Sequence, residues 1–578
     1  SHELVIPVVR REVLQRAYRD FTFLMLMFRH RHLVLVLCCA SCPNGASPVS
    51  LDGLKPPFGY AIRAADGIGA GQIAIAGGGD FNGDGRPDIL LSKHGNVYVV
   101  FGNASQAEGV STADLDGSNG FVISGTASDF VGGSVAFAGD VNNDGKTDIV
   151  FDASGVLPNG GEVYVVFGRA GVSFPEGLQL IHLNPADGFV VRGPRGVHVA
   201  GVGDVNGDGV DDFVIGDSSA NGQGSTPRAS RGYGEVHVIF GNVHGFLEGP
   251  YDWGALSDGA HGFIVKGAGY WHLLGDRGLA GGDVNGDGIN DLLLGANGAS
   301  PAGRPEAGAA YVVFGRADNF PSVVSLDRLS AADGFVIQCG TDGERCGISV
   351  AWAGDVNHDG VGDMIVGAHS APGYAVPQHP DAAFRKGPYE KQAGAAYIIF
   401  GSRIFPTALD VRDLNGSNGF AARGSQRYEL AGLSVAGAGD VNQDGIDDII
   451  IGAPGANNNG GRAYIVFGRS TPFDREMELA ELSGGCGYLI NGPSNCTTAW
   501  CDHDAGHQVA GASDINGDGT ADVLVSLGQD FMEYPAGDAF VVYGRPSPPS
   551  AECPEGIEED RLSYYLSYYR QLRSPPPP

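Results

Sequence analysis

Seven segments of the sequence repeat one spacing of oxygen-bearing side chains. Each has Asp at position one, Asn at three, Asp at five, Gly at six and Asp at nine. The side-chain members are Asp80, Asn82, Asp84, Asp88; Asp140, Asn142, Asp144, Asp148; Asp204, Asn206, Asp208, Asp212; Asp283, Asn285, Asp287, Asp291; Asp355, Asn357, Asp359, Asp363; Asp440, Asn442, Asp444, Asp448; and Asp514, Asn516, Asp518, Asp522. Because the first three alternate, their oxygens can converge on one point. The Gly permits a sharp turn that brings the carbonyl of the seventh residue to the same point. These seventh residues are Arg86, Lys146, Val210, Ile289, Val361, Ile446 and Thr520.

Carboxylate, amide and carbonyl oxygens are the ligands that Ca²⁺ prefers in proteins. The start of each segment is similar to an EF-hand loop, but no Glu stands at position twelve and strand-like runs flank it. The alternative is an ordinary turn, because Asp, Asn and Gly also favour turns. A turn does not need three acids and one Asn in fixed register. The sequence therefore predicts up to seven calcium sites.

Short apolar runs flank each predicted calcium loop. In the most complete copy, residues 433–469, the runs cover 433–438, 449–451 and 464–467. Runs of this length, bounded by Gly, Asn and Pro, are typical of strands. They do not alternate strictly with polar residues, which predicts burial on both faces.

Two further pairs repeat in step with the loops. The third run of each unit ends in an aromatic residue and Gly, at 101–102, 167–168, 240–241, 314–315, 400–401, 467–468 and 543–544. A fourth run opens with Gly and an aromatic residue, at 59–60, 120–121, 188–189, 262–263, 334–335, 419–420 and 487–488. Four runs in each of seven units predict an all-β fold, a seven-bladed β-propeller of four-stranded antiparallel blades. The chain begins with a fourth-type strand, which we expect to complete the last blade and close the ring.

The repeat, with its GDVNxDGxxD loop, the IGAP segment at 451–454 and the YVVFG type of ending, resembles the FG-GAP repeat of the integrin α-subunit head. The resemblance covers about residues 50–546. It implies Ca²⁺ in hairpins on one face of a propeller and a ligand surface on the other. All seven units carry a loop here, whereas integrin heads carry them in some blades only. We expect a free-standing head, without leg domains or a transmembrane span.

The predicted domains are a leader over 1–48, the propeller over 49–546 and a low-order tail over 547–578. Within the leader, basic residues 29–32 precede an apolar run at 33–40, which is typical of a secretory signal peptide. Cys339 and Cys346 flank one short loop between units, and Cys496 and Cys501 flank another at the equivalent junction. This placement predicts two local disulfides in an oxidising compartment, with a transition-metal site as the alternative for the second pair. We expect a secreted or cell-surface protein.

Two long connections, 217–232 and 368–394, join second to third strands. The second contains Tyr374, Phe384, Arg385 and Tyr389, residue types that are enriched in binding hot spots. Connections of this type lie on the face opposite the 1–2 loops, so we expect ligand binding there. The alternative is a tolerated surface insertion.

The net charge is −31, which argues against nucleic acid as a partner. No catalytic motif of a common hydrolase, metalloprotease, nucleotide-binding or dinucleotide-binding type is present. The expected function is extracellular binding of a protein or glycan, or cell adhesion. A calcium-dependent enzyme of the polysaccharide lyase type and a structural matrix or surface-layer component are the alternatives, and an enzyme is the less favoured reading.

Overall fold

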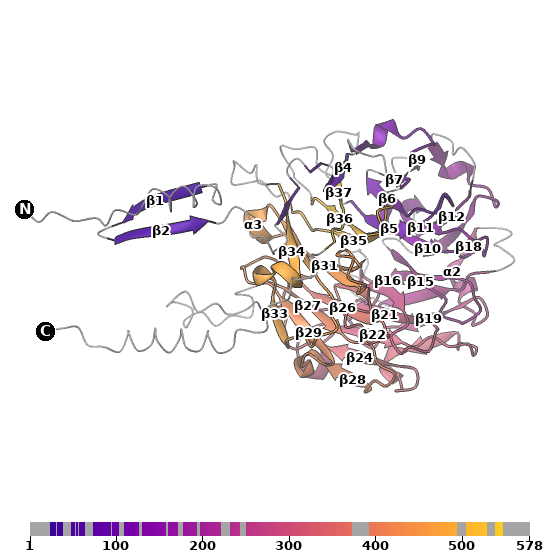
Figure 1. The fold of residues 1–578 in the computed structure, drawn as a ribbon. Coiled ribbons are helices and arrows are strands. Elements are labelled where there is room, and N and C mark those ends of the chain that lie inside the picture. Colours follow the sequence, from indigo (N-terminus) through magenta and orange to yellow (C-terminus); the bar gives the residue numbers. More distant parts are fainter. Residues whose placement is uncertain are drawn as a thin grey trace, which may run out of the picture.

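Seven sheets of five strands account for most of the computed structural model, in the order that the repeat predicts (Figure 1). The structure describes residues 23–29, 32–38, 48–51, 54–55, 57–63, 73–93, 95–102, 109–125, 130–157, 160–170, 177–193, 197–220, 232–242, 250–372, 392–493, 504–528 and 538–546. β1 (Phe23–Arg29) and β2 (His32–Cys38) pair antiparallel in a two-stranded sheet of their own. The predicted tail, residues 547–578, lies outside the described residues.

Four antiparallel strands form the body of each blade, as predicted. From the first strand to the fourth they are β5 (Ile75–Gly79), β6 (Asp88–Lys93), β7 (Asn96–Val100), β9 (Gly120–Ser124) in blade 1; β10 (Val131–Gly139), β11 (Asp148–Leu157), β12 (Gly160–Val166), β14 (Gly188–Gly193) in blade 2; β15 (His198–Gly203), β16 (Asp212–Asp217), β17 (Glu235–Ile239), β19 (Gly262–Lys266) in blade 3; β20 (Leu279–Gly282), β21 (Asp291–Ala296), β22 (Ala309–Val313), β24 (Gly334–Gln338) in blade 4; β25 (Ser349–Gly354), β26 (Asp363–Ala368), β27 (Ala395–Ile399), β29 (Gly419–Arg423) in blade 5; β30 (Ser434–Gly439), β31 (Asp448–Ala453), β32 (Arg462–Val466), β34 (Gly487–Asn491) in blade 6; and β35 (Val509–Ser513), β36 (Asp522–Ser526), β37 (Ala539–Val542), β4 (Gly59–Arg63) in blade 7.

A fifth, short strand was not predicted from the sequence. It pairs parallel to the fourth strand of each blade and, in blades 1 to 5, comes from the 3–4 connection of the next blade. In blades 1 to 7 these strands are β13 (Gly177–Gln179), β18 (Tyr251–Asp252), β23 (Val323–Ser325), β28 (Ala408–Asp410), β33 (Glu476–Glu478), β3 (Val49–Ser50) and β8 (Val110–Ser111). Every blade is thus joined to a neighbour by backbone hydrogen bonds.

Single turns of helix follow most of these fifth strands. They are Thr112–Asp114, Leu180–His182, α2 (Trp253–Leu256), Leu326–Arg328, Val411–Asp413 and Leu479–Glu481. The remaining short helices are Pro301–Gly303, α3 (Ala456–Asn459) and Gly484–Cys486. A Leu precedes each Gly-aromatic pair by five or six residues: Leu54, Leu115, Leu183, Leu256, Leu329, Leu414 and Leu482. This periodic Leu is the sequence signal that could have predicted an extra repeated element.

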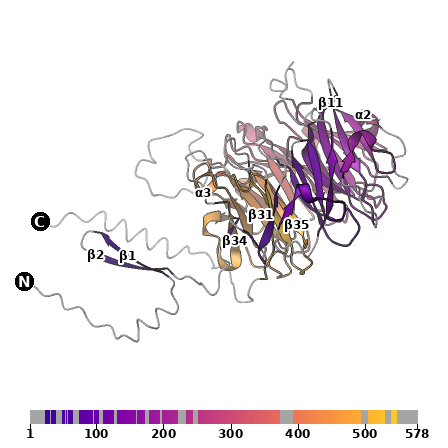
Figure 2. The same cartoon turned by 90° about the horizontal axis from the view of Figure 1, so that it is seen from above.

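The predicted closure of the ring by the N-terminal strand is confirmed. β4 pairs antiparallel with β37, with Tyr60 opposite Val541. In Figure 1 the indigo β4 lies beside the yellow β37, and Figure 2 shows α2 and α3 on opposite sides of the ring. β3 and β8 complete blades 6 and 7, so three N-terminal strands take part in the closure.

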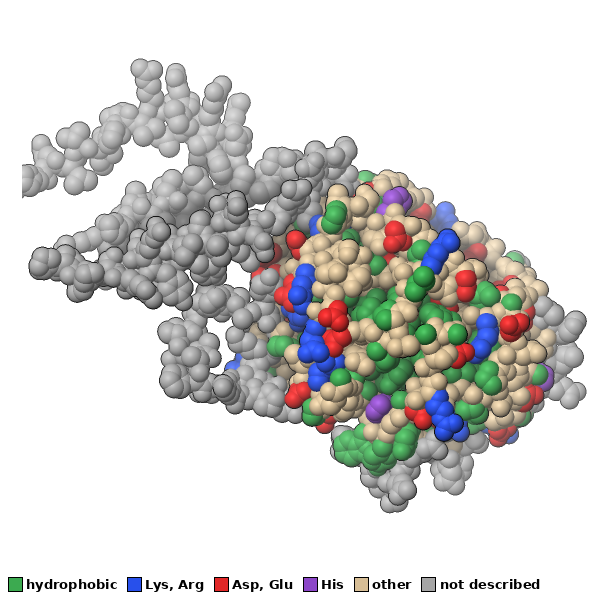
Figure 3. All heavy atoms as spheres, turned by 90° about the horizontal axis from the view of Figure 1, so that it is seen from below, with side chains coloured by type: hydrophobic (Ala, Val, Ile, Leu, Met, Phe, Trp, Pro, Cys, Tyr) green, Lys and Arg blue, Asp and Glu red, His purple; other side chains and the backbone are tan. Residues whose placement is uncertain are grey.

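The hydrophobic core consists of seven clusters, and each lies between two neighbouring blades. Second strands such as β31 are buried along their whole length, which confirms the predicted burial on both faces. On the coloured part of the face drawn in Figure 3, basic side chains are interspersed with acidic and hydrophobic ones. Within the described residues, no helix has the length and apolarity needed to cross a membrane.

Candidate metal sites

The seven predicted calcium loops all connect a first strand to a second strand. In antiparallel blades such connections lie on one face of the ring, which is called the loop face below. The Gly at position six has φ between 84° and 90° in all seven loops. Residues with a Cβ adopt this conformation at a cost, so the predicted need for Gly at the turn is confirmed.

The first, third and fifth side chains gather around backbone N–H groups of their own loop. In the loop of blade 6, Asp440 Oδ1 accepts from the Asp444 N–H at 3.0 Å and its Oδ2 from the Gly445 N–H at 2.8 Å. Asn442 Oδ1 also accepts from the Asp444 N–H at 2.9 Å, and Asp444 Oδ1 accepts from the Ile446 N–H at 3.0 Å. The structure therefore brings these three side chains together, as predicted.

The ninth-position Asp has a structural role that the sequence analysis missed. Asp448 is fully buried; its Oδ2 accepts from the Val441 N–H at 3.0 Å and its Oδ1 from the Gly468 N–H at 2.8 Å. The same two contacts recur in the other six loops. Each ninth Asp thus fastens the start of its loop to the end of the third strand. This explains why the aromatic-Gly pair repeats in step with the loop.

Negative charges in each loop lie close enough to affect one another. Burial, opposed by backbone hydrogen bonds and reinforced by the charge of Asp84, raises the pKa of Asp88 to about 7. Burial likewise raises the pKa of Asp148 to about 8, with Asp144 and Asp140 adding to the rise. The pKa of the ninth Asp is raised by burial and by fifth-position charge in the remaining loops as well. A bound cation would relieve this repulsion.

The donors of each loop are oxygens only, which fits a hard cation such as Ca²⁺. The side chains at positions one, three, five and nine would hold the ion, together with the seventh carbonyl. In the described residues no group of three or more His, Cys, Asp or Glu is arranged to hold a metal ion. The carboxylates face backbone N–H groups instead, and calcium binding stays a prediction.

Within the described residues, backbone hydrogen bonds join six of the seven loops to the next blade. The carbonyl of Val441, the second residue of its loop, accepts from the Arg545 N–H of blade 7 at 2.7 Å. Equivalent bonds reach the carbonyls of Phe81, Val141, Val205, Val284 and Val356 from the residue after the aromatic-Gly pair of the following blade. The Asp211 carboxylate also accepts from the Asp140 N–H of the preceding blade at 2.8 Å. The loop face is therefore a continuous part of the ring.

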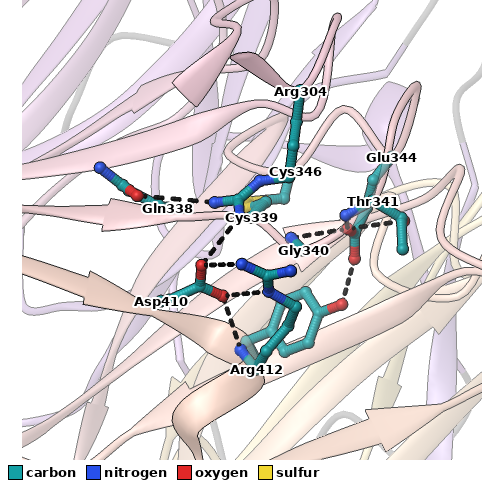
Figure 4. Close-up of a disulfide and its surroundings, with 10 residues drawn as sticks. Arg304, Gln338, Cys339, Gly340, Thr341, Glu344, Cys346, Asp410 and Arg412 are labelled. Atoms are coloured by element: carbon teal, nitrogen blue, oxygen red, sulfur yellow. Dashed lines mark hydrogen bonds and ion pairs between the residues drawn. A yellow bond between two sulfur atoms is a disulfide. The ribbon is translucent and has the colours of Figure 1, made fainter. Parts of the chain in front are cut away.

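One of the two predicted disulfides is confirmed on the opposite face. Cys339 and Cys346 are joined, with Cα atoms 6.2 Å apart, in the connection from β24 to β25 (Figure 4). In the same view, Arg304 and Arg412 both form ion pairs with Asp410. Burial by itself would raise the pKa of Asp410, but the hydrogen bonds from Arg412 and the charge of Arg304 outweigh it and lower that pKa to about 2. Cys496 and Cys501 lie outside the described residues.

Two buried glutamates each fix one connection on this face, and neither was predicted from the sequence. Glu344 accepts from the Gly340 N–H at 3.0 Å, the Thr341 N–H at 2.8 Å and the Tyr397 hydroxyl. Glu429 accepts in the same way from two N–H groups of its own loop and from the Tyr464 hydroxyl. Both glutamates stand three residues before the Gly that precedes a first strand, which is the signal that could have identified them.

The predicted ligand residues Tyr374, Phe384, Arg385 and Tyr389 lie outside the described residues. Their segment leaves the described part at Pro372 and returns at Gln392, which form a β-bridge. Both belong to a 2–3 connection, so the segment starts and ends on the face opposite the loops. The role of the four side chains stays a prediction.

A cavity of about 710 Å³ follows the central axis between the first strands. Its lining is mostly small, including Ala76, Ala200 and Gly281, with Phe137 and Trp352 as the large members. Asp440 and Asp514 lie at its loop-face end. The first strands therefore line this channel with mostly small side chains.

The chain folds as a seven-bladed propeller, and parts of it match models of FG-GAP repeats. The model described as FG-GAP repeat matches residues 276–313 and 431–466, and the model described as FG-GAP-like repeat matches residues 80–151.

Integrin α-subunits are among the proteins that the chain resembles. Integrin alpha pat-2 of Caenorhabditis elegans is 27% identical over 279 residues, which are 48% of this chain and 19% of that protein. Integrin alpha-V of Gallus gallus is 28% identical over 263 residues, 44% of this chain and 20% of that protein. Phosphatidylinositol-glycan-specific phospholipase D of Bos taurus is 33% identical over 184 residues, 32% of this chain and 19% of that protein. The matches thus span about a fifth of these relatives.

Proposed function

We propose that this chain is a calcium-stabilised extracellular propeller that binds a protein or glycan ligand, as in cell adhesion. The observation that carries the proposal is the position of exposed aromatic side chains. Of the six that the described residues expose, five lie on 2–3 or 4–1 connections, on the face opposite the loops: Phe130, Tyr233, Tyr270, Trp271 and Tyr428. Exposed apolar groups gathered on one face are typical of recognition surfaces.

Three of these aromatic residues form a continuous group. The ring centroids of Tyr233 and Tyr270 are 5.9 Å apart, and those of Tyr270 and Trp271 are also 5.9 Å apart. Tyr and Trp supply large contact areas with little loss of side-chain entropy. This group is therefore the described surface that best fits a ligand-binding role.

Calcium would act on the other face. The loops offer oxygen donors in seven equivalent hairpins, and burial together with the charge of the fifth-position Asp raises the pKa of the ninth-position Asp. Ca²⁺ bound there would stabilise the hairpins by binding only the folded state. The ion would hold the blades that present the ligand surface and would not contact the ligand.

Two features support an extracellular location. The relatives include integrin α-subunits, and the Cys339–Cys346 disulfide suits an oxidising compartment. The predicted signal peptide agrees with this location.

An array of extracellular proteins and glycans, probed in millimolar Ca²⁺, tests the proposal. The double variant Tyr270→Ala, Trp271→Ala should lose binding to the ligand found, with an unchanged melting curve. Ile404→Ala is the matched control, because Ile404 is an exposed apolar residue on a 3–4 connection at the loop face. Normal binding by the double variant together with weak binding by Ile404→Ala would place the ligand on the loop face and contradict the proposed binding surface. Elemental analysis of the purified protein for calcium tests the metal separately.

A further inference from the structure

Two turns on the loop face have the same sequence except at one position. Residues 114–121 of blade 1 read DLDGSNGF, and residues 413–420 of blade 5 read DLNGSNGF. Each segment leads into the fourth strand of its blade, so each turn belongs to a 3–4 connection. Asn415 in blade 5 therefore stands where blade 1 has Asp116. Comparison of the two turns shows what the asparagine adds.

The two turns have the same hydrogen bonds. Asn415 Oδ1 accepts from the Ser417 N–H at 2.9 Å and from the Ser417 hydroxyl at 2.8 Å. Asp116 Oδ1 accepts from the N–H and the hydroxyl of Ser118 at 2.9 and 2.6 Å. The glycine that follows has a φ of 88° in blade 5 and of 87° in blade 1. An aspartate therefore makes this turn as well as an asparagine does, and the turn does not require the amide nitrogen.

The amide nitrogen of Asn415 has no structural role in the described part of the chain. The residue is exposed, and the hydrogen bonds of its side chain there all use Oδ1. The nearby Asn418 differs, because its Nδ2 donates to the Asp413 carbonyl at 3.2 Å. Nδ2 of Asn415 is therefore an atom that can be substituted without the loss of a hydrogen bond.

Asn415 also begins an acceptor sequence for N-linked oligosaccharides. Asn415, Gly416 and Ser417 form the tripeptide Asn-X-Ser, with X other than Pro, which marks glycosylated surface loops of secreted proteins. Two more tripeptides of this type begin at Asn103 and Asn495, which lie outside the described residues. Among the described residues, the turn in blade 5 thus combines the acceptor sequence with an exposed and unengaged amide nitrogen.

We propose that Asn415 is a glycosylation site that carries an N-linked oligosaccharide on Nδ2. This inference rests on the extracellular location proposed above, because the sugar comes from a lipid diphosphate-linked oligosaccharide donor of the secretory pathway. A bond forms between Nδ2 and the anomeric carbon of the donor, and the bond from that carbon to the diphosphate oxygen breaks. Nδ2 loses one proton and the lipid diphosphate leaves. Oδ1 keeps both hydrogen bonds of the turn, so the fold accommodates the modified residue.

The position of the glycan has a consequence for ligand binding. Asn415 lies on the loop face, whereas the aromatic group of Tyr233, Tyr270 and Trp271 lies on the opposite face. An N-linked glycan is bulky and hydrated, so it would keep macromolecules away from its sector of the loop face. The opposite face stays free. Glycosylation at Asn415 therefore favours the approach of a ligand from the side of the aromatic group.

Two productions of the full chain in cultured insect cells separate the site from the location. In the first, an added cleavable signal peptide directs the chain into the secretory pathway; in the second, the chain relies on its own N-terminal residues. The protein is treated with peptide N-glycosidase in heavy-oxygen water, and its peptides are analysed by mass spectrometry. The enzyme converts a glycosylated asparagine to a labelled aspartate, whereas earlier spontaneous deamidation leaves no label. Asn415 should be labelled in most molecules of both productions.

Variants of the two turns provide matched controls. Asn415→Asp should lose the label at this site and should melt like the deglycosylated wild type, because Asp116 already forms the same turn. Asp116→Asn is the reverse change and should gain a glycan in blade 1. Ser417→Thr keeps the acceptor tripeptide and should stay modified, whereas Ser417→Ala should be unmodified.

Each outcome decides for or against the site. Absence of label on Asn415 in the first production would overturn it, whether or not Asn103 and Asn495 are labelled. Label that persists at this position in Ser417→Ala would also overturn it, because the modification would then not depend on the acceptor tripeptide. An unlabelled chain retained inside the cell in the second production would overturn the extracellular location, and with it the natural use of the site, even if the first production is labelled.

Discussion

Replacing Asp448 by Ala should destabilise the protein whether or not calcium is present. The change removes the acceptor for two buried N–H groups, those of Val441 and Gly468, which lie 3.0 and 2.8 Å from its carboxylate oxygens. An unsatisfied buried donor costs about 1–3 kcal/mol, so the loss should be about 2–6 kcal/mol. Asp444→Ala should behave differently, because Asp444 is exposed and its main contact is the Ile446 N–H of its own loop.

The expected loss for Asp444→Ala depends on calcium. Extracellular calcium modules bind at roughly 10⁻⁴–10⁻³ M, so about 10 mM Ca²⁺ stabilises one site by about 1.4–2.7 kcal/mol. Asp444→Ala should lose about this amount in calcium and less than about 0.5 kcal/mol in EGTA. The wild type should itself unfold at lower urea in EGTA than in calcium.

Urea unfolding of both variants, with and without calcium, measures these effects. Asp474→Ala is the control, because Asp474 is an exposed acid of the same region. If Asp448→Ala unfolds like the wild type in EGTA, the two hydrogen bonds do not stabilise the blade and the structural role is wrong. If the wild type unfolds identically in calcium and EGTA, the loops do not bind calcium.

Three other changes test separate parts of the fold. Tyr397→Phe leaves the buried Glu344 without its hydroxyl donor and should cost about 1–3 kcal/mol of unfolding free energy. Tyr311→Phe, at the equivalent strand position of blade 4, is its control. Gly445→Ala should cost about 1–2 kcal/mol through φ alone, because no atom lies within 4 Å of the added Cβ. Asp152 is buried, and burial raises its pKa to about 6. Its ionisation therefore opposes folding, so wild-type stability should fall as pH rises from 4 to 6, and the fall should be smaller in Asp152→Asn.

The elements that repeat in the sequence were the ones that could be predicted. Seven copies of the loop fixed the strands on either side, and the position of Gly59–Tyr60 before the first loop predicted how the ring closes. The Cys339–Cys346 disulfide followed from two cysteines on one short loop. These inferences depend on local spacing, which one sequence displays directly.

Interactions between distant residues could not be predicted in the same way. Glu344 and Tyr397 meet across a connection and two strands. No spacing marks such a pair, since only the assembled blade brings the two residues together. For the ninth Asp, the sequence shows the spacing but not the contacts. Its hydrogen bond to the end of the third strand can be recognised only in the assembled blade.

The ninth Asp also links the metal sites to the cohesion of the ring. Its carboxylate fastens the loop to the third strand of its own blade, while the second residue of the same loop accepts a hydrogen bond from the following blade. A charge that strains the loop therefore acts on a contact between blades, where the hydrophobic clusters also lie. Since each cluster is shared by two blades, no blade has a core of its own on which to fold alone. A cation that neutralised one loop would consequently stabilise the contact between that blade and the following one. This coupling gives a physical reason for the loop to recur around the ring, because a loop without its acids would leave one contact of a closed ring without that support.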